Sequence, residues 1–219
     1  MKVTDKITIT NEDNMELMAR YPDNYFDLAI VDPPYGLGTK TTDGGSKKNS
    51  QTKFMKDIRR TNWDNAIPSE KYFTELKRVS KNQIIWGGNY MAEHIGNTKC
   101  ILIWDKMTYI PTMSQFEFAF CSMNKHPQMI KINSNDPNRQ HPTQKPIKLY
   151  EWIIDKYTKE GDKILDTHGG SMSIAIAVDN MNKINGMNLT LDLCELDEEY
   201  FNAGVKRVKN QVSQLKIGF

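Results

Sequence analysis

The feature that most constrains this fold is a series of seven short, largely apolar runs, separated by segments with helical periodicity. Runs that are apolar on both faces are typical of strands buried in a parallel sheet, whereas half-exposed strands alternate apolar and polar residues. The segments between the runs repeat apolar residues every three to four positions, which predicts helices that cover the sheet. The sequence therefore predicts an α/β fold with a doubly wound, mostly parallel sheet. The predicted strands are Lys6–Thr10, Phe26–Val31, Gln83–Trp86, Cys100–Trp104, Phe116–Cys121, Lys163–Asp166 and Leu189–Glu195, and the predicted helices are Met15–Ala19, Ser69–Val79, Ile147–Tyr157 and Glu198–Val208.

Length and composition predict a globular protein with one core. The chain has 219 residues, of which 38% are hydrophobic and 26% charged, and no apolar run approaches the ~20 residues that a membrane span requires. We expect a single domain over residues 1–219, with residues 37–66 and 105–142 as long loops. The three cysteines lie in apolar, strand-like contexts without metal-ligand spacing. This pattern predicts reduced core thiols in a cytoplasmic protein, with no bound metal and no membrane association.

One stretch of the near-neutral chain is distinctly basic. Between residues 40 and 60, seven lysines and arginines stand against two aspartates, whereas the whole chain carries a net charge of +2. Such a local excess of cations suits a loop that contacts phosphates, and the alternative is an ordinary solvated surface loop. Because loops this long are uncommon in compact domains unless they are disordered or functional, a functional role is favoured. The candidates for phosphate contact are Lys47, Lys48, Lys53, Arg59 and Arg60.

The most distinctive motif is Asp32-Pro33-Pro34-Tyr35, which follows the apolar run Leu28–Val31. In an open α/β sheet, ligands bind at the carboxyl ends of the strands, so a site is expected here. Each proline fixes its own φ angle and restricts the residue before it to extended conformations. The motif thus predicts a stiff segment that holds one carboxylate and one aromatic ring in set directions. The alternative is a proline-rich turn with a capping aspartate.

Two further segments extend the pattern. Residues 163–173 predict a strand that ends at Asp166 and continues into the turn Gly169-Gly170, where the absence of Cβ atoms lets the backbone approach a ligand closely. Residues 141–146 (His-Pro-Thr-Gln-Lys-Pro) lead into a predicted helix. Together with Asp32–Tyr35, these segments resemble the motifs of amino-methyltransferases that act on DNA. Their order, with the catalytic motif first and the cofactor turn last, resembles the β class, a circularly permuted form of the seven-stranded, Rossmann-like methyltransferase sheet.

The resemblance implies transfer of a methyl group from S-adenosylmethionine to the exocyclic N6 amine of adenine in double-stranded DNA, with Asp32, Pro33, Pro34 and Tyr35 as catalytic residues. The Asp32 carboxylate and the Pro33 carbonyl would accept the two amino hydrogens and so localise the lone pair of the nitrogen. Tyr35 would stack on a base that has been flipped out of the duplex. Direct transfer of this kind needs neither a covalent enzyme intermediate nor a metal. The loops 37–66 and 105–142 are then expected to contact DNA, in part through phosphates, which position a protein without specifying sequence.

The resemblance also assigns the cofactor site. Glu195 closes the strand after Asp166 and is placed to hydrogen-bond ribose hydroxyls, as acidic residues do in other doubly wound folds. Asp13 is implied to meet the adenine amine of the cofactor, and Ser171 is expected to cap the helix after the turn. Helix capping is the alternative role for Asp13 and Glu195. The cofactor-binding candidates are Asp13, His141, Lys145, Asp166, Thr167, His168, Gly169, Gly170, Ser171 and Glu195.

One residue of the cofactor turn departs from the family pattern. Met172 stands where the family usually carries a second glycine, and its side chain is expected to crowd the methionine moiety of the cofactor or to shift the start of the helix. Trp86–Tyr90 and Trp104–Lys106 follow predicted strands and are expected at the rim of the crevice, although their aromatic rings fit the core as well. Glu117 stands between Phe116 and Phe118, and the pattern leaves open whether it faces inward.

Several alternatives remain open. An aspartate at the first motif position favours adenine, because cytosine-modifying relatives more often carry serine there, but N4 of cytosine or an RNA base is the alternative within this chemistry. A non-catalytic DNA-binding relative is the alternative outside it, and Met172 is the feature that favours it. The chain leaves little room for a separate target-recognition domain, so a homodimer on DNA is a further hypothesis.

Overall fold

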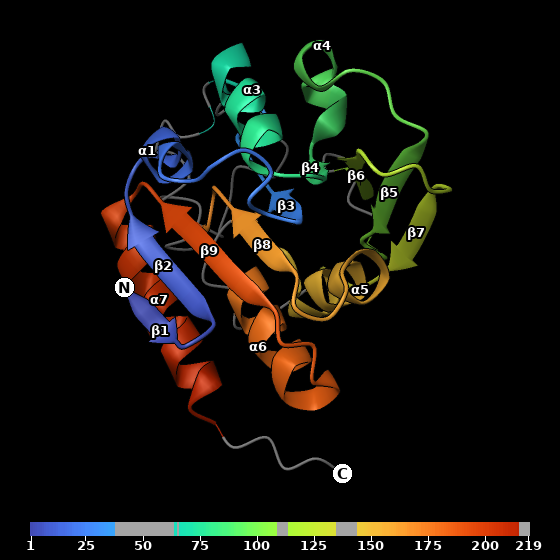
Figure 1. Cartoon of the computed structure of the whole chain (residues 1–219). Coiled ribbons are helices and arrows are strands. Elements are labelled where there is room, and N and C mark those ends of the chain that lie inside the picture. Colours follow the sequence, from blue (N-terminus) through green and yellow to red (C-terminus); the bar gives the residue numbers. More distant parts are fainter. Residues whose placement is uncertain (38–63, 65, 109–113, 135–143, 215–219) are drawn as a thin grey trace, which may run out of the picture.

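The computed structural model describes residues 1–37, 64, 66–108, 114–134 and 144–214. Its centre is a nine-stranded sheet in the order β1-β2-β9-β8-β3-β4-β6-β5-β7, with helices on both faces (Figure 1). The strands are β1 (Lys2–Thr4), β2 (Ile7–Asn11), β3 (Leu28–Val31), β4 (Gln83–Trp86), β5 (Cys100–Asp105), β6 (Phe116–Cys121), β7 (Gln128–Lys131), β8 (Lys163–Asp166) and β9 (Thr190–Glu195), and the helices are α1 (Asn14–Ala19), α3 (Glu70–Val79), the 3-10 helix η2 (Gly88–Tyr90), α4 (Ala92–Ile95), α5 (Ile147–Tyr157), α6 (Ser173–Asn185) and α7 (Glu198–Val212).

The sheet is mostly parallel, as the sequence predicts. Strands β2, β9, β8, β3 and β4 are parallel to one another, and β1 is antiparallel to β2. Strand β6 runs antiparallel to both β4 and β5, and β7 is parallel to β5. All seven predicted strands form, and so do the four predicted helices. The strand number is nine rather than seven, because β1 and β7 add to the two edges of the sheet. Neither edge strand contains a fully buried residue, so neither carries the apolar pattern that marks the other seven.

The side chains of the strands form two cores, one on each face of the sheet. One core joins the sheet to α5, α6 and α7 and contains Ile30, Trp86 and Trp104. The other joins it to α1, α3 and α4 and contains Val31 and Phe120. This two-sided burial is why β3 is apolar at every position and β4 at every position except the buried Gln83, since both faces of a doubly wound sheet are covered.

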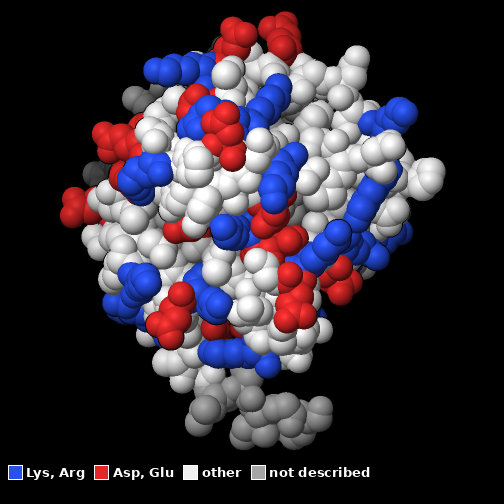
Figure 2. Space-filling model, viewed as in Figure 1, with Lys and Arg blue, Asp and Glu red and all other residues white. Residues whose placement is uncertain are grey.

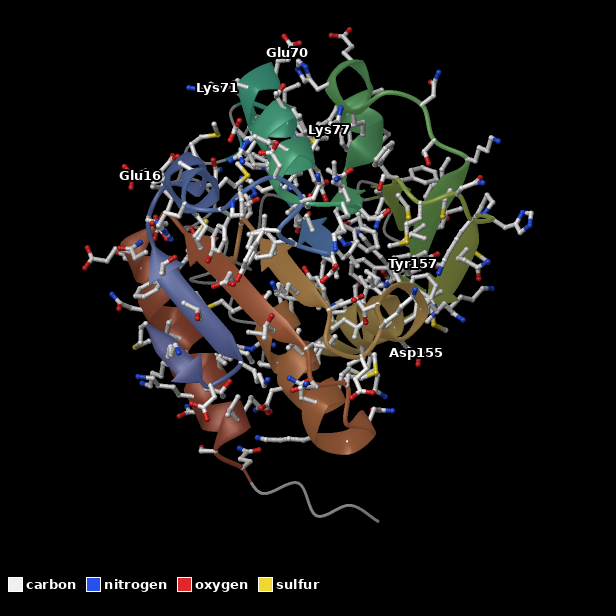
Figure 3. The ribbon with its side chains drawn as sticks, in the orientation of Figure 1. Glu16, Glu70, Lys71, Lys77, Asp155 and Tyr157 are labelled. Atoms are coloured by element: carbon white, nitrogen blue, oxygen red, sulfur yellow. The ribbon has the colours of Figure 1, made fainter. Side chains whose placement is uncertain are left out.

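Helices α3 and α5 show how the amphipathic pattern meets the sheet. In α3, Tyr72 and Phe73 are buried, while Lys71 and Lys77 are exposed and project away from the sheet (Figure 3). In α5, the buried Tyr157 packs under the sheet while its neighbour Asp155 points away (Figure 3). The same spacing determines which face of each helix packs against the sheet.

The chain reverses its direction of winding between β8 and β3. These strands are parallel neighbours, but β3 continues outward to β4, whereas β8 continues to β9 on the other side. Such a reversal leaves a crevice at the carboxyl ends of the two strands, which is where open α/β sheets bind their ligands. Both distinctive motifs of the sequence follow these two strands, since Asp32 comes directly after β3 and the glycine turn directly after β8.

Two expectations from composition can be compared with the fold. Cys100, Cys121 and Cys194 are buried free thiols, as predicted. Within the described ranges, no helix combines the length and the apolarity that crossing a membrane would require.

Candidate active site

A cavity of about 580 Å³ lies at the carboxyl ends of the central strands. Its lining comes from the segments that follow β2, β3, β8 and β9, from the N-terminal part of α3 and from the start of α7. Parts of the chain that are far apart in sequence therefore meet in one space, as a crossover sheet allows. The lining residues are Glu12, Asp13, Asn14, Met15, Asp32, Pro34, Ala66, Pro68, Ser69, Tyr72, Lys145, Tyr150, Thr167, His168, Gly169, Gly170, Ser171, Glu195, Leu196, Asp197 and Tyr200.

The segment Asp32–Tyr35 is held by hydrogen bonds at both ends. The Tyr35 hydroxyl donates to Oδ1 of Asp32 over 2.7 Å. The backbone N–H groups of Tyr35 and Gly36 both donate to Oδ1 of Asp64, over 2.6 and 2.9 Å. Asp32 and Pro34 line the cavity, whereas Pro33 and Tyr35 do not. The motif thus presents its carboxylate to the cavity and places its aromatic ring beside it.

Lys145 joins the catalytic candidate to the second half of the chain. Only 3% of this lysine is exposed, and its Nζ forms an ion pair with Oδ2 of Asp32. The same Nζ lies 3.2 Å from Oε2 of Glu117 and donates to the Tyr35 hydroxyl over 3.3 Å. Sequence reasoning predicts a cofactor role for Lys145. The structure places it on the cavity wall, but its described ion-pair and hydrogen-bond partners belong to the segment Asp32–Tyr35 and to β6.

Burial and ion pairing act in opposite directions on these groups. Burial raises the pKa of Asp32 above its usual value, and the Lys145 ammonium opposes that rise. Burial by itself disfavours the Lys145 ammonium, but Asp32 and Glu117 outweigh it, so the pKa of Lys145 is raised. Lys145 is therefore a cation at neutral pH, and a buried cation of this kind has to remain paired.

Gly87 explains how the Tyr35 ring is positioned. The ring stacks on Tyr90, with centroids 5.2 Å apart and planes inclined by 21°. A Cβ atom on Gly87 would lie 2.2 Å from Cε1 of Tyr35, so the ring occupies the space that any other residue would fill. Gly87 also adopts a left-handed conformation, with φ 67° and ψ 21°. The segment Trp86–Tyr90 therefore lies beside the motif, as the sequence predicts, although Trp86 itself is a core residue.

The turn after β8 approaches β9 closely. The Gly169 N–H donates to the Cys194 carbonyl over 2.9 Å, and a Cβ on Gly169 would lie 2.6 Å from Cδ2 of Leu193. Glu195 accepts hydrogen bonds from the backbone N–H of Gly170 (2.7 Å) and of Asp197 (2.9 Å). Both carboxylate oxygens of Glu195 thus hold the turn and the start of α7 while the residue lines the cavity.

The helix-capping role expected of Ser171 is wrong. The residue that caps α6 is Met172, and the Ser171 hydroxyl lies 3.1 Å from the Ser173 hydroxyl. Arg207 fixes this start by donating to the Ser171 carbonyl and, over 3.0 Å, to the Ser173 hydroxyl. Ser171 still lines the cavity.

Met172 does not crowd the cavity. It adopts a left-handed conformation with φ 57°, which turns its side chain away, and it is absent from the cavity lining. The side chain is fully buried and lies against Gly204 of α7, where an added Cβ would be 2.7 Å from the Met172 sulfur. The departure from the family's glycine is therefore accommodated by a complementary glycine on the neighbouring helix.

The rest of the turn forms a buried polar cluster. Burial lowers the pKa of His168 to about 4, so its ring is neutral. Its Nε2 lies 3.2 Å from the side-chain amide nitrogen of Asn14, and its Nδ1 lies 2.9 Å from the Thr167 hydroxyl. Because the Asn14 amide can only donate, Nε2 accepts this hydrogen bond and Nδ1–H donates to Thr167. The Thr167 hydroxyl also lies 2.7 Å from the Tyr72 hydroxyl. This cluster ties α1 and α3 to the turn.

Asp166 does not line the cavity and instead accepts a hydrogen bond from the backbone of the turn. It is 2% exposed, and its Oδ1 accepts from the His168 N–H over 3.0 Å. Burial raises the pKa of Asp166 to about 8. Asp13, in contrast, lines the cavity and also caps α1 by accepting from the Met15 N–H over 2.7 Å, so the capping role proposed for it is confirmed.

Some predicted site residues cannot be compared with the structure. His141 and the five phosphate-contact candidates lie outside the described residues. Sequence reasoning missed Tyr72, Tyr150 and Tyr200, which line the cavity, because their helical spacing is also that of core residues. It also left Glu117 unresolved, although register with β5 settles its direction. Among the described residues, no group of three or more His, Cys, Asp or Glu side chains is arranged to hold a metal ion.

The fold and the cavity define a class of protein: a doubly wound sheet with a carboxylate motif after one central strand and a glycine turn after its neighbour. The family described as DNA methylase (N6_N4_Mtase) matches residues 85–206, more than half of the chain. The chain belongs to this family. The matched range includes Lys145, the glycine turn and Glu195, while Asp32–Tyr35 lies before it.

The comparisons with curated and solved proteins agree with this assignment. The Type II methyltransferase M2.MboI of Moraxella bovis is 24% identical, with 91% of this chain and 89% of that protein covered. The Type II methyltransferase M.HpaI of Haemophilus parainfluenzae is 24% identical, with 86% and 70% covered. Among solved structures, the cytosine-N4-specific PvuII DNA methyltransferase superposes with a TM-score of 0.59 at 13% identity, with 95% and 93% covered. The M1.HpyAVI–SAM complex superposes with a TM-score of 0.56 at 18% identity, with 92% and 99% covered.

The contact between Gly87 and Tyr35 generates the first prediction. Gly87→Ala should destabilise the fold and lower methyl transfer, because the new methyl group displaces the Tyr35 ring as well as straining a left-handed backbone. Gly186→Ala is a matched control, since Gly186 has nearly the same φ and ψ, 66° and 22°, but no atom within 4 Å of an added Cβ. Gly186→Ala should cost about 1–2 kcal/mol of unfolding free energy, measured by urea denaturation, and leave transfer unchanged. Equal effects of the two variants on stability and on rate would contradict the assigned packing of Tyr35.

Proposed function

We propose that this chain transfers a methyl group from S-adenosylmethionine to the N6 amine of adenine in double-stranded DNA. The observation that carries the proposal is the placement of Asp32 on the wall of the same cavity that the glycine turn and Glu195 line. A group that can hold an amine and a turn that can hold a cofactor thus share one space.

The cavity offers polar groups for each part of S-adenosylmethionine. Gly169 and Gly170 line it, and without Cβ atoms they let a ligand approach the backbone of the turn. Glu195 keeps carboxylate lone pairs beyond its two backbone hydrogen bonds, and we assign these to the ribose hydroxyls. Asp13 is assigned to the adenine amine, and the residues 167–171 to the methionine moiety. When bound, S-adenosylmethionine supplies an electrophilic methyl group on a sulfonium.

The catalytic segment would hold the acceptor amine. The Asp32 carboxylate and the Pro33 carbonyl accept the two amino hydrogens, so that the lone pair of the nitrogen is localised and directed into the cavity. The Tyr35 hydroxyl bond to Asp32 fixes the carboxylate in that orientation. Tyr35 and its stacked partner Tyr90 provide an aromatic surface beside the motif, on which a flipped base can stack.

The choice of adenine over cytosine rests on Asp32. Cytosine-modifying relatives more often carry serine at this position, so the aspartate favours adenine. N4 of cytosine is the second candidate acceptor, and the similarity of the fold to the cytosine-N4-specific PvuII enzyme favours it. The same two hydrogen-bond acceptors would hold either amine.

The feature that favoured a non-catalytic DNA-binding protein, Met172, no longer supports that alternative. Met172 suggested a damaged cofactor turn, but its side chain packs against Gly204 and does not line the cavity. Asp32, Lys145 and Glu195 are all in place around that cavity.

Contact with the duplex is assigned to the basic segment. On the face shown in Figure 2, the lysines and arginines of the described residues are interspersed with acidic side chains. The candidates Lys47, Lys48, Lys53, Arg59 and Arg60, which lie outside the described residues, are proposed to bind DNA phosphates. Their contribution should weaken as salt rises, because phosphate binding releases counterions.

The test of the proposed function is methyl transfer from radiolabelled S-adenosylmethionine to genomic DNA, followed by nucleoside digestion and mass spectrometry. The wild type should form N6-methyladenine, and Asp32→Ala should lower the rate about 100-fold or more. Asp23→Ala is the matched control, because Asp23 is exposed and pairs with Arg78 away from the cavity. Formation of N4-methylcytosine would keep the mechanism and overturn the base. Full activity of Asp32→Ala would overturn the proposed site.

We also propose that the protein acts as a homodimer. Ile101, Phe116 and Met129 are 38%, 45% and 57% exposed. The strand register places them on one face of β5, β6 and β7, so they form an apolar surface near the edge of the sheet. Large exposed apolar surfaces of this kind mark contact sites.

Light scattering coupled to size-exclusion chromatography tests the dimer. The wild type should elute at twice the mass of the chain, and Met129→Lys should shift it toward the monomer. Ile184→Lys, at a residue of α6 that is 68% exposed, should leave the mass unchanged. A monomer at all concentrations, with and without DNA, would remove the hypothesis.

A further inference from the structure

Glu117 faces the catalytic aspartate through a lysine. In β6, Glu117 lies opposite Trp104 of β5, and Ala119 lies opposite Trp86 of β4. Residues opposite each other share a face of the sheet, so Glu117 lies on the face that α5 covers. Ile30 belongs to the core on that face, and Asp32 follows it by two residues. The period of the strand therefore directs Glu117 toward Asp32 and leaves Phe116 and Phe118 on the opposite face.

Four charged side chains form a continuous chain across this face. Asp32 pairs with Lys145, Lys145 lies 3.2 Å from Oε2 of Glu117, and Oε1 of Glu117 lies 2.7 Å from Nζ of Lys106. The exposed fractions of these side chains are 18%, 2%, 22% and 17% in that order. The chain carries two negative and two positive charges, so its net charge is zero. Lys106 lies directly after β5 and does not line the cavity.

Glu117 is not needed to neutralise Lys145, because Asp32 already does so. A single buried ion pair would satisfy the lysine, yet here one ammonium is shared between two carboxylates. Sharing leaves Asp32 less strongly neutralised than it would be in an isolated pair, so its oxygens remain better acceptors for the hydrogens of an amine. Lys106 in turn keeps Glu117 ionised. Burial alone would raise the pKa of Glu117, but Lys145 and Lys106 together lower it to about 2.

We propose that Glu117 is a positioning residue of the methyl-transfer reaction, which acts through Lys145 to set the charge and orientation of Asp32, and that Lys106 balances it. The inference rests on the proposed role of Asp32. When the nitrogen lone pair forms the new N–C bond, the sulfonium S–C bond would break and its electron pair would stay on sulfur. Positive charge then develops on the nitrogen, and a proton has to leave it. A neutral four-group chain lets the Asp32 carboxylate stabilise that charge and accept that proton. Without Glu117 the chain carries a net positive charge, which opposes both.

The proposal predicts opposite pH shifts for two variants. Within the part of the chain that the structure describes, the titratable groups that face Asp32 are Lys145, Tyr35, Glu117, Tyr150 and Asp166. Glu117→Gln leaves the chain with a net charge of +1, which should lower the pKa of Asp32 and move the acidic limb of the rate profile to lower pH. Lys106→Met leaves the chain of charged side chains with a net charge of −1. This should raise the pKa of Asp32 and move the acidic limb of the rate profile to higher pH. The double variant restores a net charge of zero and should return the limb toward its wild-type position.

The experiment measures single-turnover methyl transfer to genomic DNA at saturating S-adenosylmethionine between pH 5 and 9, with cofactor affinity measured separately by calorimetry. Glu117→Gln should lower the maximal rate about tenfold or more and leave cofactor affinity within about threefold, because Glu117 does not line the cavity. Glu75→Gln is the matched control, since Glu75 is 25% exposed and pairs with Arg78 outside the site. It should change neither rate nor pH profile.

The outcomes separate this inference from the proposed function. Shifts of opposite sign, with reversal in the double variant, support the positioning role, because a merely structural loss would not change sign with the charge removed. Unshifted limbs, or limbs that move in the same direction, would overturn it. Asp32→Ala, which removes the hydrogen-bond acceptor, is run in parallel: if it remains fully active, the proposed site is wrong. If it is inactive while Glu117→Gln behaves as wild type, only the role of Glu117 fails.

Discussion

The structure of the site depends on the buried ion pair between Asp32 and Lys145. The two residues are more than one hundred positions apart, and their contact fixes the segment after β3 against the segment that precedes α5. A cation that is 3% exposed is tolerated only with partners, so the folded state requires the segment Asp32–Tyr35 to take this position. Tyr35 and Glu117 then take theirs around the same ammonium. The orientation of the carboxylate is thus a consequence of how a buried lysine is neutralised.

The crossover of the sheet places this ion pair beside the glycine turn. Because β3 and β8 are parallel neighbours, the segments that follow them reach the same edge. Asp32 and Gly169–Ser171 therefore line one cavity. The turn is held in position by the close packing of Gly169 on β9 and of Met172 on Gly204. In this arrangement the sheet brings the two segments close together, and their side chains provide the charged groups of the site. This is the usual arrangement of ligand sites in doubly wound folds.

Much of the fold and of the candidate site could be predicted from the sequence, since buried strands and the motif Asp32–Tyr35 carry strong local signals. The edge strands β1 and β7 could not, because strands without fully buried residues lack an apolar pattern. Ser171 was expected to cap α6 from its residue type, but the left-handed backbone of Met172 moved the cap by one residue. The side-chain direction of Met172 depended on Gly204, which lies on another helix. Likewise, the inward direction of Glu117 depended on register with β5, and register is a property of the assembled sheet.

The most direct test of this account is a double-mutant cycle of unfolding free energies for Asp32→Asn and Lys145→Met, measured by urea denaturation without cofactor. Removing one partner of a buried ion pair typically costs about 3–5 kcal/mol, whereas replacing both is far less costly. The account predicts that each single variant is strongly destabilised and that the double variant is more stable than the sum of the two effects by about 2 kcal/mol or more. Effects that add to within about 0.5 kcal/mol would show that the two residues do not interact, and would contradict the central role of this ion pair.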